Sequence, residues 1–237
     1  MAKMIRFSSQ PELLWKECID MKYIHKKPAP PELVAYSKTS GASYKDLYDN
    51  HNDIWGNTRL SLADEQGYIC CYCGQRITGF QGTQIEHIWP KGKPTYVKMQ
   101  LDYENNLIAT CDGGKKMRKS DTSIPSSDLH CDTSKSNTPI PIHPLMLNCE
   151  EKFLYDENGD IFGVGSDAEV TIEILNLSSP ILKNKRKAAI ASLTLFPCID
   201  WKSEYDRLNQ KNSNGEYTEF CFVLRNYIEF FHSEELK

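Results

Sequence analysis

The feature that most constrains the fold of this chain is a loop-rich segment that begins at two closely spaced cysteines. Cys70 and Cys73 stand in the sequence CCYCG, and the residues from Gln75 to His143 are rich in Gly, Pro, Ser and Asn. Such a segment buries little apolar surface, so it keeps a fixed shape only when something ties it together. A C-x-x-C turn places two thiolates at the spacing of a tetrahedral zinc site. The sequence therefore predicts a metal-tied middle region.

Two further zinc ligands are expected among the later cysteines. Cys111 in LIATCDGG and Cys131 in LHCDTSKSN would close the segment into one unit. His130 is an alternative fourth ligand, in which case Cys111 is an ordinary buried strand residue. A redox pair formed by Cys70 and Cys73 is another alternative, but such a pair opens a helix within a βαβ pattern, whereas a turn and loop follow here.

Length and composition restrict the class of protein. A chain of 237 residues can bury a core without disulfide bonds. No apolar run approaches the roughly 20 residues of a membrane helix, and MAKMIRFSSQPELLW lacks the apolar core of a secretory signal. We therefore expect a cytoplasmic protein with no membrane contact. The formal net charge of -4 excludes coating of nucleic acid by charge alone, so any such contact is local or shared with a partner.

Helices are expected on both sides of the middle region. Apolar residues recur at near-helical spacing from Gln10 to Ile24, a second helix follows HKKPAPPEL, and one or two more are predicted between Tyr44 and Gln66. GYICCYCG predicts a strand and a tight turn. The end of the chain, residues 167–235, has the pattern of two or three amphipathic helices, with NLSSP as a turn between the first pair.

A β-hairpin is predicted directly after the middle region, in KFLYDENGDIFGV. Asn158 and Gly159 both tolerate positive φ, which a type I′ turn requires at its two central residues. The sequence therefore predicts an α+β chain of three parts: an N-terminal helical region at 1–60, a metal-tied domain at 61–145, and a β-hairpin with C-terminal helices at 146–237.

Glu86 and His87 are adjacent in TQIEHIWPKGKP, a few residues beyond the cysteine pair. Burying either group without a partner costs several kcal/mol, so a core strand gains nothing from both. The pair therefore indicates a functional site.

Four elements in this order resemble the HNH endonuclease family, namely CCYCG, IEHIWPK, LDYENNLIATC and HCDTSKSN. They extend over roughly Gln66 to Pro144. The wider chain is similar to the HNH nuclease component of Septu-type and retron-associated antiphage defence systems, which share the IEH..PK form, the following hairpin and a TIEILNL helix. The resemblance implies a ββα-metal nuclease core within 61–145 and an ABC-type ATPase partner. One departure is that the family spaces its second cysteine pair closely, whereas Cys111 and Cys131 enclose a basic, Ser-rich insertion.

The resemblance also implies a catalytic role for three of these residues. His87 would be the general base that activates water, Glu86 would bind Mg²⁺ or Mn²⁺, and Asn137 would supply a second oxygen ligand, as suits a hard cation. Successive strand residues point to opposite faces, so we expect a bulge or turn that brings Glu86 and His87 to one phosphate.

Four other polar residues have supporting roles by the same resemblance. Asn106 would fix the loop or the histidine ring, with Asn105 as the alternative, because a second layer of groups orients such rings. Lys91 and Lys135 would contact phosphate.

The expected function is metal-dependent cleavage of DNA or RNA by the effector of a defence complex, and the sequence does not distinguish the two substrates. One alternative is a zinc-stapled binding module that recruits a partner without cleaving. Another is a zinc redox switch that uses Cys70 and Cys73.

Overall fold

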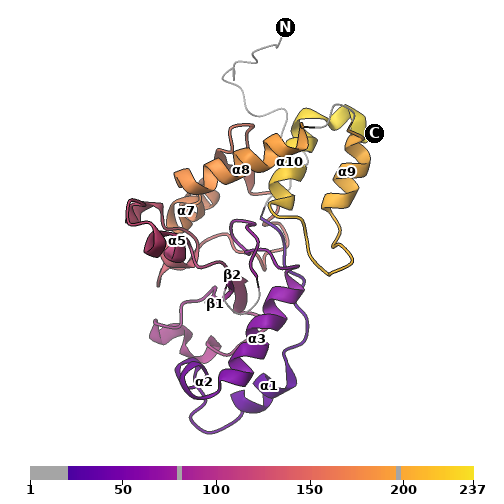
Figure 1. Ribbon diagram of the computed structural model, residues 1–237. Coiled ribbons are helices and arrows are strands. Elements are labelled where there is room, and N and C mark those ends of the chain that lie inside the picture. The colour runs from indigo at the N-terminus through magenta and orange to yellow at the C-terminus, as the bar shows by residue number, and fades with distance from the viewer. Residues whose placement is uncertain (1–20, 79–81, 196–198) are drawn as a thin grey trace.

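The computed structural model describes residues 21–78, 82–195 and 199–237, which form a mixed structure of helices and two small sheets. The helix expected from Gln10 to Ile24 lies largely outside the described residues, and residues 21–24 are not helical. Figure 1 shows the N-terminal helices at one end of the molecule and the C-terminal helices at the other, with one small sheet between them. Within these residues, no helix has the length and apolarity needed to cross a membrane.

The N-terminal helices confirm the sequence pattern. They are α1 (Pro31–Ser37), α2 (Tyr44–Asn50) and α3 (Asn52–Glu65). Pro31 begins α1, where the missing N–H of proline is harmless, and the Ser43 side chain caps α2 by accepting the N–H of Asp46. The boundary suggested at residues 60 and 61 falls inside α3, so this helix carries the chain directly into the middle region.

The middle region contains one antiparallel hairpin and short helices. Its elements are β1 (Gln84–His87), η1 (Pro94–Met99), β2 (Leu107–Thr110), α5 (Lys115–Ser120), η2 (Ser126–Asp128) and α6 (Asp132–Lys135). GYICCYCG forms a turn closed by a single bridge between Ile69 and Arg76, so the strand predicted there is wrong. The two ends of the basic, Ser-rich insertion between Cys111 and Cys131 lie side by side, because the N–H of His130 donates to the Gly113 carbonyl at 3.1 Å.

The Gln66 side chain fastens the cysteine turn to this hairpin. Its amide nitrogen donates to the carbonyls of Ile69 and Ala109 at 3.1 and 2.8 Å, and its oxygen accepts the Ala109 N–H at 2.7 Å. Three buried bonds from one residue at the end of α3 therefore fix the turn against β2.

The predicted second hairpin is present as β3 (Phe153–Tyr155) and β4 (Ile161–Gly163), but its turn is not type I′. Only Gly159 has a positive φ, of 79°, while the Asp156 carboxylate accepts the N–H groups of Asn158 and Asp160. The Gly159 N–H donates to the Asp156 carbonyl, which makes a type I turn followed by a glycine bulge. Asp156 stabilises this longer loop, so the type I′ turn predicted from Asn158 and Gly159 does not form.

In its described residues, the C-terminal part has four α-helices where two or three were predicted. They are α7 (Ser166–Leu175), α8 (Pro180–Leu193), α9 (Trp201–Leu208) and α10 (Cys221–Phe231), followed by η3 (Ser233–Leu236). The extra break follows α9, where the Asn212 side chain accepts the N–H groups of Asn214 and Glu216 and folds a turn around Gly215. Side-chain bonding to the backbone thus competes with helix at this point.

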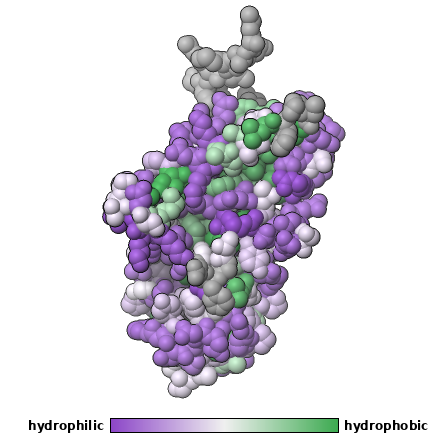
Figure 2. All heavy atoms as spheres, viewed as in Figure 1, coloured by the Kyte–Doolittle hydropathy of each residue, from purple (hydrophilic) through white to green (hydrophobic). Residues whose placement is uncertain are grey.

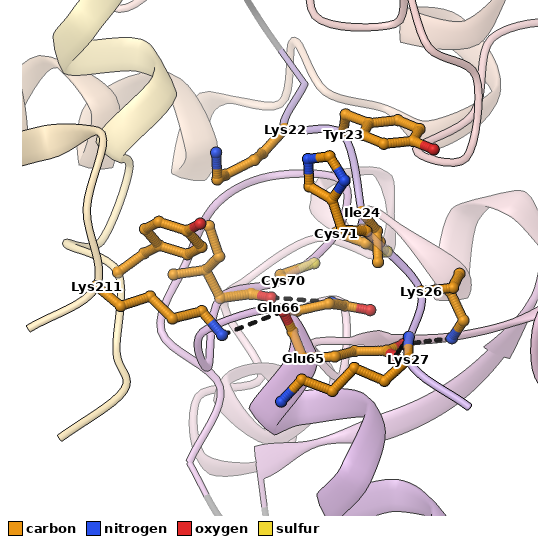
Figure 3. A pocket seen from close by; sticks show the side chains of 13 residues that line it. Lys22, Tyr23, Ile24, Lys26, Lys27, Glu65, Gln66, Cys70, Cys71 and Lys211 are labelled. Carbon is orange, nitrogen blue, oxygen red and sulfur yellow. Dashed lines mark hydrogen bonds and ion pairs between the residues drawn. The ribbon is translucent and has the colours of Figure 1, made fainter. Parts of the chain in front are cut away.

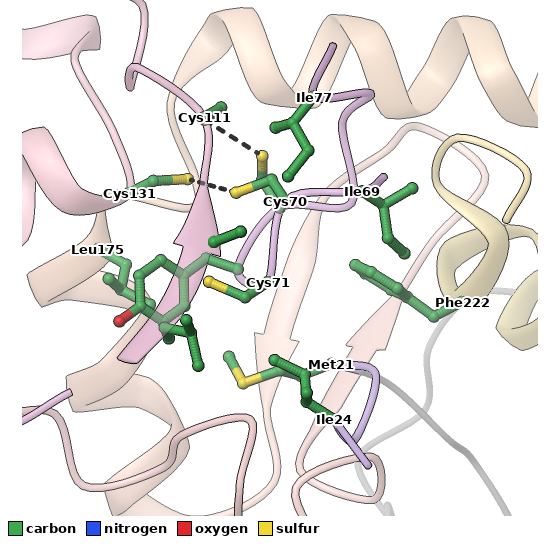
Figure 4. Close-up of a cluster of buried hydrophobic side chains, with 14 of the residues drawn as sticks. Met21, Ile24, Ile69, Cys70, Cys71, Ile77, Cys111, Cys131, Leu175 and Phe222 are labelled. Carbon is green, nitrogen blue, oxygen red and sulfur yellow. Dashed lines mark hydrogen bonds between the residues drawn. The ribbon is translucent and has the colours of Figure 1, made fainter. Parts of the chain in front are cut away.

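Buried residues from all three parts form one apolar cluster. Figure 4 shows Met21 and Ile24, the cysteine turn, Leu175 of α7 and Phe222 of α10 meeting around β2. A Cβ on Gly74 would lie 2.7 Å from the Phe222 ring, so α10 packs directly on the turn. The face of the molecule seen in Figure 2 is largely hydrophilic, with apolar residues in small areas.

Replacing Gly159 by alanine tests how the second hairpin packs on α8. Gly159 has a positive φ, and an added Cβ would lie 2.4 Å from the Lys183 carbonyl oxygen and 2.7 Å from the Lys187 nitrogen. Gly41 is a matched control, because its φ is +80° but nothing lies within 4 Å of an added Cβ. Both variants place alanine at a positive φ, which costs stability in each. The free energy of unfolding should fall by about 1–3 kcal/mol more in Gly159→Ala, because the backbone of α8 must also shift. Urea denaturation measures both, and equal losses would contradict this packing.

Candidate metal centre and adjoining polar site

Four buried thiols converge in the middle region. The sulfur atoms of Cys70, Cys73, Cys111 and Cys131 all lie within 4.8 Å of one another. Two of the distances are 3.9 Å, between Cys70 and Cys131 and between Cys73 and Cys111. Zinc–sulfur bonds of about 2.3 Å in a tetrahedron place the sulfurs about 3.8 Å apart. The four thiols therefore fit a structural zinc ion, and the predicted ligand set is brought together (Figure 4).

Each ligand is positioned by a different local structure. Cys70 and Cys73 lie in the turn, where the Cys70 N–H donates to the Gln75 carbonyl at 2.8 Å and the Gly74 N–H donates to the Cys70 carbonyl at 3.0 Å. Cys111 directly follows β2, and Cys131 directly precedes α6. Burial opposes ionisation of Cys70, but hydrogen bonds from the neighbouring thiols outweigh it and lower the pKa of that thiol.

His130 is not part of this cluster, whereas Cys111 is, so the arrangement favours Cys111 as the fourth ligand. The Gln75 amide nitrogen lies 3.2 Å from the Cys73 sulfur and 3.1 Å from His130 Nε2. Because an amide nitrogen only donates, His130 Nε2 accepts, and Nδ1 donates to the Asp128 carbonyl at 3.1 Å. Burial lowers the pKa of His130, in keeping with a neutral ring in a layer outside the thiols.

The Glu86 carboxylate lies in a buried polar cluster beside the metal centre. Its Oε1 atom is 2.7 Å from the Lys135 ammonium and accepts the Tyr72 hydroxyl at 3.2 Å. The Asp132 side chain also contacts it as a hydrogen-bond partner. Burial, and then the charge of Asp132, raise the pKa of Glu86 to about 8, although Lys135 opposes them. Two carboxylates and one ammonium group thus share a site in which Glu86 and Lys135 are buried and Asp132 is partly exposed.

Sequence reasoning assigned no role to Asp132. It occupies the first turn of α6 directly after Cys131, so the same segment delivers a thiol to the metal centre and a carboxylate to Glu86. The available signal was an acidic residue adjoining a predicted ligand in HCDTSKSN.

His87 lies on the other side of β1. Residues 84–87 pair with 107–110 in unbroken register, so the bulge expected at Glu86 and His87 is absent and the two side chains diverge. His87 Nε2 is 3.1 Å from the Gln100 carbonyl oxygen, and the Tyr44 ring meets the imidazole edge-on at 4.5 Å. A carbonyl only accepts, so Nε2 carries the proton and Nδ1 is a buried acceptor with no partner among the described residues. Burial, helped by Lys91, lowers the pKa of His87 to about 3.

Asn106 connects the chain after β1 to the loop before β2. Its side-chain oxygen accepts the Trp89 N–H at 2.7 Å, and its nitrogen donates to the carbonyls of Met99 and Trp89 at 2.9 and 3.3 Å. Asn105 is exposed and bonds only to Asp102. Of the two, Asn106 therefore has the geometry that fixes the loop next to His87.

The remaining predicted residues differ in exposure. Lys135 is 1% exposed and also donates to the His87 carbonyl at 2.8 Å, so a phosphate cannot reach it in this arrangement. Lys91 is exposed, with its ammonium 4.4 Å from the centre of the Tyr44 ring. Asn137 is exposed and lies against Gly92, where an added Cβ would come within 2.7 Å of its side-chain oxygen. No contact joins Asn137 to Glu86 among the bonds of the described residues.

The purified chain should contain one zinc ion, bound by the four thiols. Cys111→Ser and Cys131→Ser should lose the ion and destabilise the middle region, because the binding free energy of a structural metal adds directly to that of folding. His130→Gln should keep the ion, and so should Cys149→Ser, a buried cysteine outside the cluster whose thiol donates to the Met21 carbonyl at 3.2 Å. Elemental analysis of each variant gives the answer. Full zinc content in Cys111→Ser, or loss in His130→Gln, would refute this ligand set.

Asn106→Ala should lower the free energy of unfolding by about 2–3 kcal/mol, since it removes a fully buried side chain and leaves backbone groups of Trp89 and Met99 without their partner. Asn105→Ala is the neighbouring control and should change stability by no more than about 0.5 kcal/mol. Chemical denaturation compares them. Similar values for the two variants would show that Asn106 does not hold the loop.

Neither a protein-family model nor a curated protein sequence matches this chain.

Proposed function

We propose that this protein is a metal-dependent HNH endonuclease that hydrolyses phosphodiester bonds of DNA or RNA as the effector of an antiphage defence complex. One observation carries the proposal: a four-thiol centre holds a two-stranded hairpin on which Glu86 meets Asp132, with His87 as the next residue. The order of motifs that resembles the HNH family supports the same assignment.

Glu86 and Asp132 are the side chains that would hold a catalytic cation. Two carboxylates in contact repel each other when both are charged, and hard oxygen ligands of this kind suit Mg²⁺ or Mn²⁺. When bound, such a cation neutralises charge on the phosphate and stabilises the leaving oxygen. Asp132 replaces Asn137 as the second ligand in this proposal, because Asp132 contacts Glu86 and the exposed Asn137 does not.

His87 would accept the proton of the attacking water. The Gln100 carbonyl holds the proton on Nε2, which leaves the lone pair of Nδ1 as the basic position. The Asn106 side chain bonds to the Trp89 N–H and to the Met99 carbonyl. These bonds would limit how the segment after His87 moves.

Cleavage requires this site to open. Glu86 and His87 are only 4% and 3% exposed, and Lys135 forms an ion pair with Glu86 where a cation would bind. His87 is covered by Tyr44, at the start of α2. A phosphate reaches the buried Nδ1 only after a neighbouring group such as Tyr44 moves away, while the Gln100 bond to Nε2 is kept. We propose that an ABC-type ATPase partner provides this opening.

The second candidate function is a zinc-stapled binding module, and the same burial favours it. A module that only recruits a partner has no need of an accessible base, and the Glu86–Lys135 pair would then serve to hold α6 on the hairpin. Cleavage assays separate the two functions directly.

The first test is cleavage of DNA and RNA side by side, by the chain alone and with the product of its neighbouring gene, in Mg²⁺ or Mn²⁺. We expect products with a 5′-phosphate and a 3′-hydroxyl. His87→Ala should reduce the rate by about 10²–10⁴-fold and keep its zinc, because a general base acts only in the transition state. Absence of cleavage under every condition, or wild-type rates in His87→Ala, would favour the binding module.

The second test separates the two candidate cation ligands. Asp132→Ala should abolish cleavage at low metal concentration and regain part of it when Mn²⁺ is raised, since mass action fills a weakened site. Asn137→Ala, only a few residues further along the chain, should cleave at the wild-type rate. The reverse result would restore Asn137 as the ligand. Zinc content serves as the control that Cys131 remains in place.

A further inference from the structure

A pocket of about 330 Å³ opens on the side of α3 and the cysteine turn, and lysines line it from separate parts of the chain. Its basic residues are Lys22, Lys26, Lys27, Lys211 and His25. Figure 3 shows Lys22 and Lys211 on one side and Lys26 and Lys27 on the other. The N-terminal segment supplies three of the lysines, and the loop after α9 supplies Lys211, so only the folded chain assembles the group.

The acidic side chains nearby balance only part of this charge. Among the lining residues, Glu65 is the one carboxylate, and it pairs with Lys26. Lys27 pairs with Asp64 at 2.7 Å, at a position that is half exposed. Lys22 lies 3.9 Å from Glu150.

Lys211 has no carboxylate partner among the ion pairs of the described residues. Its ammonium donates to the carbonyls of Asp64 and Glu65 at 2.7 and 3.2 Å, at the C-terminal end of α3. Burial lowers the pKa of Lys211; the charges of Lys27 and Lys22 act in the same direction, and those of Asp64 and Glu65 oppose them.

We propose that this lysine pocket binds a phosphate ester. An anion between Lys22, Lys27 and Lys211 would turn mutual repulsion into charge-assisted hydrogen bonds, for which the compact ammonium group of lysine is well suited. Tyr23 and Tyr217 line the same space, and the ammonium groups of Lys22 and Lys211 lie 4.6 and 5.5 Å from the centre of the Tyr217 ring. A volume of about 330 Å³ is at the lower end of small-molecule sites, which favours a ligand the size of a mononucleotide.

This site is separate from the proposed catalytic residues. Glu86, His87 and Asp132 are not among the lining residues, and binding can be measured without cleavage. The pocket adjoins the metal centre, because Cys70 and Cys71 of the cysteine turn line it. Gln66, which bonds the turn to β2, lines it as well.

The test is calorimetric titration of the full chain at low salt with three probes: inorganic pyrophosphate, adenosine 5′-monophosphate, and a single-stranded oligonucleotide without terminal phosphates. We expect the two small phosphates to bind, and binding to weaken as salt is raised. Lys22→Gln with Lys211→Gln should weaken it by about tenfold or more, because each lysine contributes a charged hydrogen bond. Glutamine keeps a donor for the α3 carbonyls, and a denaturation curve confirms that the variant is folded.

The matched control is Lys119→Gln with Lys187→Gln, which removes two exposed lysines outside the pocket. It should bind both small phosphates like the wild type. If the oligonucleotide alone binds, and the pocket variant alone weakens it, the phosphate ester is that of a nucleic-acid backbone. The proposal is overturned if no probe binds the wild type, or if the control loses as much affinity as the pocket variant.

Discussion

The convergence of four thiols is the interaction on which the rest of the structure depends. Cys70, Cys73, Cys111 and Cys131 come from a turn, a strand end and a helix start, and the four thiols join these segments at one point. An ion bound there stabilises the folded chain by its whole binding free energy, because the unfolded chain has no preformed site. The hairpin of β1 and β2 and the short helix α6 are both anchored to this centre.

The metal centre and the carboxylate cluster are mechanically one unit. Cys131 and Asp132 are consecutive, and the Cys131 N–H donates to the Leu175 carbonyl at 2.8 Å, so α7 also holds the junction. Cys131 and Ser136, on either side of α6, have positive φ values of 53° and 50°, a conformation that non-glycine residues adopt at some cost. Surrounding contacts must therefore force the chain into this shape, and displacement of one ligand would be felt at Glu86.

Much of this fold could be predicted from the sequence because the signals were local. The C-x-x-C turn, the helices between Tyr44 and Gln66 and the second hairpin each depend on neighbouring residues, and each is present. The choice of Cys111 over His130 was not local, since it depends on how Gln75 and β2 lie across the turn. A spacing pattern carries no information on such a contact.

The polar site was harder to predict for the same reason. Strand alternation indicated that Glu86 and His87 diverge, but an expected bulge was invoked to reunite them, and the register has none. Lys135 was expected to contact phosphate but is buried, because α6 packs it over Glu86. Asp132 escaped notice because its partner lies far away in the sequence. The arrangement of this site depends on which charged residues pair across long stretches of sequence, and the identity of a single residue does not show its partner.

The insertion between Cys111 and Cys131 is a part of the chain that could change readily in evolution. Its two ends meet where His130 bonds to Gly113, and the cysteines on either side are fixed by the metal centre. Doubling the length of a closed loop costs only about 0.6 kcal/mol, a small fraction of what a structural metal contributes. Residues 114–129 could therefore lengthen, shorten or change charge with little penalty to folding. Because the bond between His130 and Gly113 closes the segment, new surface can be added there while the geometry of the four thiols stays constant.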